Sequence, residues 1–144
     1  MLDPVRYLDA WNRHALEDVL AFFAPGATYT DVALGQSHTG TDAMREFFAG
    51  LERNFSSDYR FDAGPSVVTE HGYAVEWVMR GTHDGTGPLM PATGKPYVIH
   101  GVSVGELHDG KIARNSDYWN MVEFLMQVGL MHQPAVASVA AHRD

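Results

Sequence analysis

The chain contains no cysteine, which excludes disulfide scaffolds, thiolate nucleophiles and zinc sites built from cysteine ligands. It also has no apolar run that approaches the roughly 18 residues required by a membrane-spanning helix. The first residues lack the basic start and the apolar stretch of a secretory signal peptide. We therefore expect a cytoplasmic protein that has no membrane partner.

Basic residues are scarce, because 10 lysines and arginines stand against 18 aspartates and glutamates and give a formal net charge of −8. Nucleic-acid phosphates repel such a protein, so no nucleic-acid partner is expected. The length of 144 residues, of which 45% are hydrophobic, suits one domain with one core. We assign this domain to residues 1–131 and expect residues 132–144, which are rich in small side chains, to form a flexible tail.

The order of helical and strand patterns predicts an α+β fold. Asp3-Pro4 has the composition of a helix start, and apolar residues then recur at three- and four-residue steps until Pro25-Gly26 ends the helical pattern. A second apolar helical stripe follows Thr41-Asp42, and a short helix is expected over 122–131. Strand patterns occupy 27–33, 59–69, 73–82, 95–107 and 111–121. We expect N-terminal helices packed on one face of a curved, mostly antiparallel sheet.

The Asp109-Gly110 pair predicts a two-residue hairpin turn between the last two strands. A regular hairpin around this turn places Val102 opposite Asp117 and makes His100 a diagonal neighbour of Asp117. Because side chains alternate along a strand, Val102 and His100 would share an otherwise apolar face with Asn115, Asp117 and Trp119. Isolated ionisable groups on such a face indicate a ligand cavity, where burial raises the pKa of a carboxyl group.

Four ionisable side chains are candidates for acid/base catalysis: Asp117, His100, Asp31 and His83. The expected substrate-binding side chains are mostly aromatic or apolar: Tyr29, His38, Trp11, Phe47, Trp77, Met79, Val102, Asn115 and Trp119. Structural alternatives stand beside these roles, since a buried aspartate could anchor backbone groups and His100 could be a hydrogen-bonded core histidine. His83 could serve only to shape its glycine-rich loop. The histidines show no compact metal-ligand spacing, so no metal site is predicted.

Short motifs follow one another through the second half of the chain. They are Gly81-Thr82-His83-Asp84-Gly85, Pro91-Ala92-Thr93-Gly94-Lys95, Gly101-Val102-Ser103-Val104, Asp109-Gly110-Lys111-Ile112, Asp117-Tyr118-Trp119-Asn120 and Gln127-Val128-Gly129-Leu130. Together with Trp11, Phe22-Phe23, Tyr29, Asp31 and Gly40, this ordered set resembles the SnoaL-like polyketide cyclases, or ester cyclases, of the nuclear transport factor 2-like superfamily. The resemblance covers residues 4–131. It implies a cone-shaped α+β barrel with a deep apolar pocket, acid/base chemistry without a cofactor, and a homodimer or higher homo-oligomer.

Cyclases of this kind close a polyketide ring by intramolecular aldol condensation, with an aspartate in the pocket as acid and base. Asp117 matches that aspartate by its position after the Gly-Lys-Ile turn. A histidine is expected opposite it, where the regular hairpin places Val102, and His100 lies two residues away. The Arg-x-Asp pair of the superfamily's epoxide hydrolases has no counterpart in residues 98–101, which demotes that reaction.

The sequence therefore predicts a cyclase-type enzyme that acts on a small hydrophobic, polyketide-like carbonyl substrate. Asp117 would move a proton, while His100, Asp31 and His83 would polarise the carbonyl or enolate oxygen. The alternatives are a non-catalytic module that binds a small hydrophobic ligand, and an isomerase, dehydratase or epoxide hydrolase that uses the same pocket.

Overall fold

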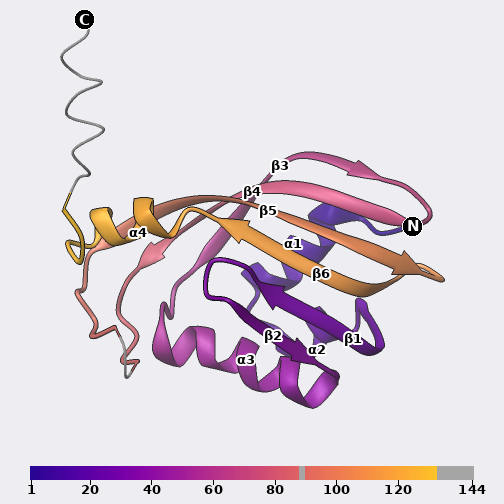
Figure 1. Cartoon of the computed structure of the whole chain (residues 1–144), viewed down its shortest axis with the longest axis horizontal. Helices are drawn as coiled ribbons and strands as arrows, with labels where there is room; N and C mark the ends of the chain where they lie inside the picture. Colours follow the sequence, from indigo (N-terminus) through magenta and orange to yellow (C-terminus); the bar gives the residue numbers. More distant parts are fainter. Residues whose placement is uncertain (88–89, 133–144) are drawn as a thin grey trace, which may run out of the picture.

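The computed structural model describes residues 1–87 and 90–132, which form four helices and one sheet. The helices are α1 (Pro4–Asn12), α2 (Leu16–Leu20), α3 (Thr41–Asn54) and α4 (Met121–Gln127). The strands are β1 (Phe23–Asp31), β2 (Gln36–Thr39), β3 (Arg60–Val68), β4 (Gly72–Thr82), β5 (Pro96–His108) and β6 (Lys111–Trp119). The long strands β3 to β6 arch over α1 and α3 (Figure 1), so the helices cover the concave face.

The six strands follow the order β2-β1-β6-β5-β4-β3. Only the β1–β6 pair is parallel, and the other four pairs are antiparallel. Within the described residues, β2 and β3 are the two edges of the sheet and do not pair with each other, so the curved sheet stays open. The predicted α+β class, with helices on a curved and mostly antiparallel sheet, is confirmed.

The first helix begins where the sequence predicts. The Asp3 carboxylate accepts hydrogen bonds from the backbone N–H groups of Val5 and Arg6, at 3.0 and 3.3 Å, and Pro4 occupies the first turn. The helical pattern is interrupted at His14, which has a φ of 54°, before α2 begins. The expectation that helix continues to Pro25-Gly26 is wrong, because α2 ends at Leu20 and Pro25-Gly26 lies inside β1, where the pairing register shifts.

The hairpin formed by β5 and β6 contains an irregularity close to its turn. Leu107 pairs with Ile112, as the two-residue turn predicts. The next pair is Glu106 with Arg114, so Ala113 has no partner across the hairpin. This arrangement is a β-bulge, which shifts the register of every pair beyond it by one residue.

The bulge changes which residues of β5 face Asp117. Ser103, rather than Val102, is the register partner of Asp117, and Val102 pairs with Tyr118. The prediction that Val102 and His100 share a face with Asp117 is therefore wrong, since a one-residue slip moves side chains to the opposite face. The His100 side chain is 67% exposed, and its Nδ1 atom lies 3.2 Å from a Glu123 carboxylate oxygen.

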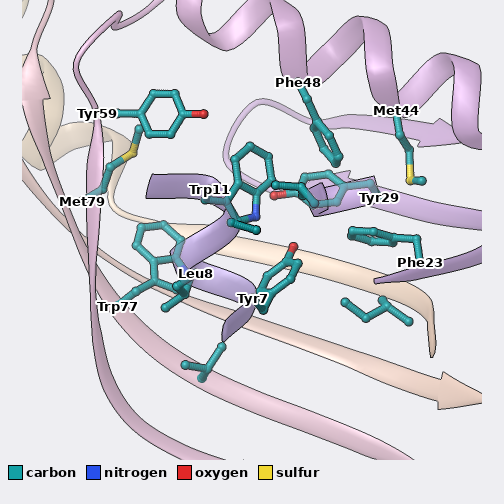
Figure 2. Packing of buried hydrophobic residues seen from close by; sticks show 14 of the residues in the cluster. Tyr7, Leu8, Trp11, Phe23, Tyr29, Met44, Phe48, Tyr59, Trp77 and Met79 are labelled. Carbon is teal, nitrogen blue, oxygen red and sulfur yellow. The ribbon is translucent and has the colours of Figure 1, made fainter. Parts of the chain in front are cut away.

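The core lies between the helices and the concave face of the sheet, and it is rich in aromatic rings. Figure 2 shows Trp11 in the middle of this cluster, with Tyr7, Tyr29 and Trp77 around it. The Trp11 ring packs edge-on against Phe48 of α3 with ring centroids 4.7 Å apart. The helices thus present one continuous aromatic surface to the inside of the sheet.

No helix in the described part of the chain combines the length and apolar character needed to cross a bilayer. The tail expected over 132–144 falls, apart from His132, outside the described residues.

Candidate active site

A cavity of about 440 Å³ opens between α1, α3 and the concave face of the sheet. This volume falls within the range of sites for small molecules, roughly 300–1,000 Å³. Aromatic side chains form much of its wall: Trp11, Tyr29, Phe47, Phe61, Trp77 and Trp119. Three carboxyl groups, from Asp31, Glu46 and Asp117, and the Arg53 guanidinium also line it. An apolar cavity with a few ionisable groups is the arrangement that the strand patterns predict.

A second hollow, of about 650 Å³, lies on the surface beside α1. Its charged lining residues include Asp9, Arg13, Asp18 and Lys111. Arg13 already pairs with both aspartates, at 3.0 and 2.8 Å, and the Lys111 ammonium donates to a backbone carbonyl at 2.6 Å. Because these charges are satisfied within the hollow, we place the candidate active site in the apolar cavity instead.

Asp117 is one of two buried acids of the apolar cavity, the other being Asp31, and it accepts three hydrogen bonds. The Ser103 hydroxyl donates to Oδ1 at 2.6 Å, the Asn115 amide donates to Oδ1 at 2.9 Å, and the Tyr29 hydroxyl donates to Oδ2. Burial raises the pKa of Asp117 above its usual value, although these three donors oppose the shift. A carboxyl group with a raised pKa can accept and return protons nearer to neutral pH.

Two further side chains hold the donors in place. The Trp77 indole donates to the Ser103 hydroxyl oxygen at 2.9 Å, and the Tyr73 hydroxyl donates to the Asn115 carbonyl oxygen at 2.5 Å.

Burial raises the pKa of Tyr29 well above its usual value, and the nearby Asp117 adds to the shift. Tyr29 therefore remains a neutral phenol that donates a hydrogen bond into the site.

Asp31 provides a second carboxyl group beside Asp117. The two are register partners across the parallel strands β1 and β6. The Trp119 indole donates to both oxygens of Asp31, at 3.0 and 3.2 Å, and the Leu34 backbone N–H donates at 2.9 Å. Burial raises the pKa of Asp31, and these hydrogen bonds oppose that effect. The cavity thus brings together two carboxyl groups with different partners.

Most of the predicted site residues do line this cavity. They are Asp117, Asp31, Tyr29, Trp11, Phe47, Trp77, Met79 and Trp119. Asn115 donates a hydrogen bond to Asp117 but does not itself line the cavity. Sequence reasoning missed the roles of Ser103 and Tyr73, although Ser103 belongs to a motif that the resemblance contains. Hydrogen bonding was the feature that pointed to Ser103. A buried carboxylate needs donors, and the valine that the regular hairpin places opposite Asp117 provides none.

Four predicted site residues, His38, His83, His100 and Val102, lie elsewhere. His100 and Val102 are on the other face of the sheet because of the bulge, so they do not meet Asp117 in the cavity. The His38 ring stacks on Phe47, with ring centroids 4.2 Å apart, and is not part of the cavity lining.

His83 is fully buried but lies outside the cavity lining, packed against Phe55 and Phe124. Its Nδ1 atom lies 3.0 Å from the Thr93 hydroxyl, and its backbone carbonyl accepts from the Gly94 N–H at 2.8 Å. These contacts close the loop that follows β4. The expected polarising role of His83 therefore lacks geometric support, and the loop-shaping alternative describes its surroundings. Over residues 1–87 and 90–132, no cluster of three or more potential ligands is placed to hold a metal ion.

Comparisons with known proteins agree with this architecture. The model of a family described as SnoaL-like domain matches residues 5–115. No curated protein sequence matches the chain.

Three solved structures illustrate the likeness. AclR, a proposed hydroxylase from Streptomyces galilaeus, is 21% identical with a TM-score of 0.78, covering 97% of this chain and 87% of its own. A proposed polyketide cyclase from Xanthomonas campestris pv. campestris is 26% identical with a TM-score of 0.74, covering 87% and 93%. An NTF2-like protein of unknown function from Burkholderia pseudomallei is 18% identical with a TM-score of 0.73, covering 87% and 93%. Similar folds thus carry different assigned reactions, and the chemistry has to be argued from the cavity.

Proposed function

Because the chain belongs to the SnoaL-like domain family, whose model covers residues 5–115, we propose that it is a cyclase-type enzyme. It catalyses an aldol-type ring closure, or a related proton transfer, on a small hydrophobic carbonyl compound of polyketide type. The reaction uses acid/base chemistry by side chains of the cavity and needs no cofactor. We also propose that the active species is a homodimer or a higher homo-oligomer.

The observation that carries this proposal is the placement of Asp117. Its carboxyl group lies at an apolar, aromatic-lined cavity, and burial raises its pKa. A group that served only to anchor backbone atoms would accept from backbone N–H groups. Asp117 instead receives its three hydrogen bonds from side chains, and two of the donors, Tyr29 and Ser103, line the same cavity.

The proposed reaction is a proton transfer followed by formation of a carbon–carbon bond. The Asp117 carboxylate removes a proton from the carbon next to a substrate carbonyl, and the resulting enolate attacks a second carbonyl carbon of the same molecule. The new alkoxide then takes the proton back from Asp117, so no proton is gained or lost overall. Once Asp117 holds the abstracted proton, the Tyr29 hydroxyl donates to the substrate oxygen, and Asp31 does so in its protonated form; these groups take the polarising role expected of His100 and His83.

The size of the cavity limits the substrate. An apolar cavity of about 150 Å³ holds one benzene ring, so about 440 Å³ corresponds to roughly three fused rings. A bicyclic aryl ketone such as 2-tetralone is therefore a suitable probe, because it fits and carries an enolisable carbon.

The test is hydrogen–deuterium exchange of 2-tetralone in D2O, followed by proton NMR. The wild-type chain should accelerate exchange next to the carbonyl, and Asp117→Asn should remove about 10²–10⁴-fold of that acceleration. His100→Gln is the matched control and should keep the wild-type rate, because His100 lies on the opposite face. Equal rates for the wild type and Asp117→Asn would refute the mechanism. Binding of 2-tetralone without accelerated exchange would favour the non-catalytic binding module.

A further inference from the structure

We infer that Gly101-Val102-Ser103-Val104-Gly105 is a support for Asp117, in which the two glycines admit the rings of Trp77 and Tyr73 across β5. Through Ser103 and Asn115, these rings anchor one oxygen of Asp117 and leave the other oxygen to exchange protons. The inference rests on the proposed function and adds Tyr73, Asn115 and Ser103 to it as positioning residues.

The glycines are required by the space that the two rings occupy. Trp77 is the register partner of Gly101, and Tyr73 is the register partner of Gly105. A Cβ atom at position 101 would lie 2.6 Å from Cζ2 and 2.7 Å from Cζ3 of Trp77, and one at position 105 would lie 2.6 Å from the Tyr73 hydroxyl. Real Cβ atoms essentially never approach so closely. Because residues two apart share a strand face, both rings lie on the face that carries Ser103.

Each ring starts a two-step relay of hydrogen bonds that ends at Asp117. The Trp77 indole donates to the Ser103 oxygen, which orients the Ser103 hydroxyl proton toward Asp117 at 2.6 Å. The Tyr73 hydroxyl donates to the Asn115 carbonyl oxygen, so the amide nitrogen is the end that faces Asp117, at 2.9 Å. Without Tyr73, the amide could flip and present its oxygen to the carboxylate.

The two relays converge on the same oxygen of Asp117. Oδ1 accepts from both Ser103 and Asn115, whereas Oδ2 accepts only from Tyr29 among the residues that the structure describes. Two donors make Oδ1 the weaker base of the pair, so the proton is exchanged at Oδ2. The Tyr29 side chain and Asp31 face this group from β1, Tyr73 faces it from β4, and Tyr7 faces it from α1.

Tyr73 is the residue that separates positioning from binding. It is buried, it is not part of the cavity lining, and its hydroxyl donates to Asn115 rather than to Asp117. Tyr59 is the matched control, because it is a fully buried tyrosine whose hydroxyl finds no hydrogen-bond partner in the described part of the chain. Tyr59→Phe therefore removes a hydroxyl without breaking a relay.

The experiment is a pH titration of the full chain labelled with carbon-13 at aspartate carboxyl groups, followed by NMR without any ligand. We expect the pKa of Asp117 to rise in Tyr73→Phe and in Ser103→Ala, because each change weakens a donor to the ionised carboxylate. Tyr59→Phe should match the wild type. An unchanged Asp117 titration in Tyr73→Phe, with a shift in Ser103→Ala, would overturn the Tyr73 relay. No shift in either variant would overturn the whole support.

Exchange kinetics with 2-tetralone provide the second measurement. Tyr73→Phe should lower kcat about tenfold and keep KM within about twofold, since misplacing a catalytic group affects the chemical step more than binding. A rise in KM with unchanged kcat would contradict positioning. If the chain catalyses no exchange of 2-tetralone, the proposed function is wrong. The titration uses no substrate, so it still tests the support for Asp117. If Tyr73→Phe does not fold, Ser103→Ala carries the titration.

Discussion

Replacing Gly101 by alanine should lower the free energy of unfolding by about 1–3 kcal/mol, the usual cost of inserting a methyl group into a packed interior. The added methyl group would meet the Trp77 ring at the Cη2, Cζ2 and Cζ3 atoms. That ring cannot move away freely, because it packs perpendicular to Phe61 with centroids 5.2 Å apart and donates to Ser103. Losing the hydrogen bond alone is worth about 1 kcal/mol.

The expected sign is opposite to the general effect of such a substitution. Where the backbone tolerates alanine, replacing glycine stabilises a protein by about 0.4–1 kcal/mol, chiefly because the unfolded chain has fewer conformations. Gly50→Ala is the matched control, since Gly50 lies inside α3 and its added Cβ would meet only the Asn54 side chain, at 3.4 Å. This control should stabilise the protein by about 0.5–1 kcal/mol.

Urea denaturation of the wild type, Gly101→Ala and Gly50→Ala provides the measurement, with the midpoints compared at equal slopes. A Gly101→Ala midpoint at or above the wild-type value would refute the contact between the glycine and the Trp77 ring. Gly105→Ala sharpens the test. Its added Cβ would meet the Arg114 backbone carbonyl as well as Tyr73, and backbone gives way less readily than a side chain, so its loss should exceed that of Gly101→Ala.

Three further predictions concern the acids and the attachment of α1. Burial raises the folded-state pKa of Asp117, so the unfolded chain loses this proton first as pH rises from about 3.9. Its contribution to stability is therefore complete at lower pH and is lost as pH rises to the folded-state value, by about 1.36 kcal/mol per unit of difference. Urea denaturation at pH 3.5 and 7 should show a larger loss of stability on raising the pH in the wild type than in Asp117→Asn, because Asp31 and the other acids contribute equally to both proteins; an equal change in the two proteins would contradict it. Trp119→Phe should raise the pKa of Asp31 in the carbon-13 titration, because the indole donates to both carboxylate oxygens; an unchanged pKa would show that this donor is unimportant. Asn12→Ala should lower the free energy of unfolding by about 2 kcal/mol, since the Asn12 amide donates to and accepts from the Phe61 backbone at 2.9 and 2.6 Å; a loss under about 0.5 kcal/mol in urea would contradict this.

The sequence was sufficient to predict most elements and one strand of the site. Apolar periodicity located the helices, and the Asp109-Gly110 turn located the last hairpin. Alternation along β6 also placed Asn115, Asp117 and Trp119 on one face, which is the inner face of the sheet. These predictions depend on local spacing, so the sequence alone contains the required information.

Local spacing does not predict the bulge at Ala113. The prediction without this bulge placed His100 and Val102 on the wrong face of the sheet. Hydrophobic alternation specifies register only where one face is clearly more apolar. Strand β5 offers apolar residues on both faces, for example Ile99 on the inner face and Val98 on the outer face. Either register therefore satisfies the hydrophobic pattern, and a slip of one residue is invisible in it.

The need of Asp117 for hydrogen-bond donors distinguishes the two registers of β5 on β6, whereas the hydrophobic pattern does not. A buried carboxylate opposite Val102 would lack a donor from β5, whereas opposite Ser103 it gains one at 2.6 Å. On its other side, β5 pairs with β4 so that Gly101 and Gly105 lie opposite the rings of Trp77 and Tyr73, which a Cβ atom at either position would meet. Burying Asp117 still costs stability, because its pKa stays raised despite three donors. The positioning residues therefore lower the cost of keeping an ionisable acid at an apolar cavity without removing its tendency to take up a proton, and this balance supports a role in acid/base chemistry.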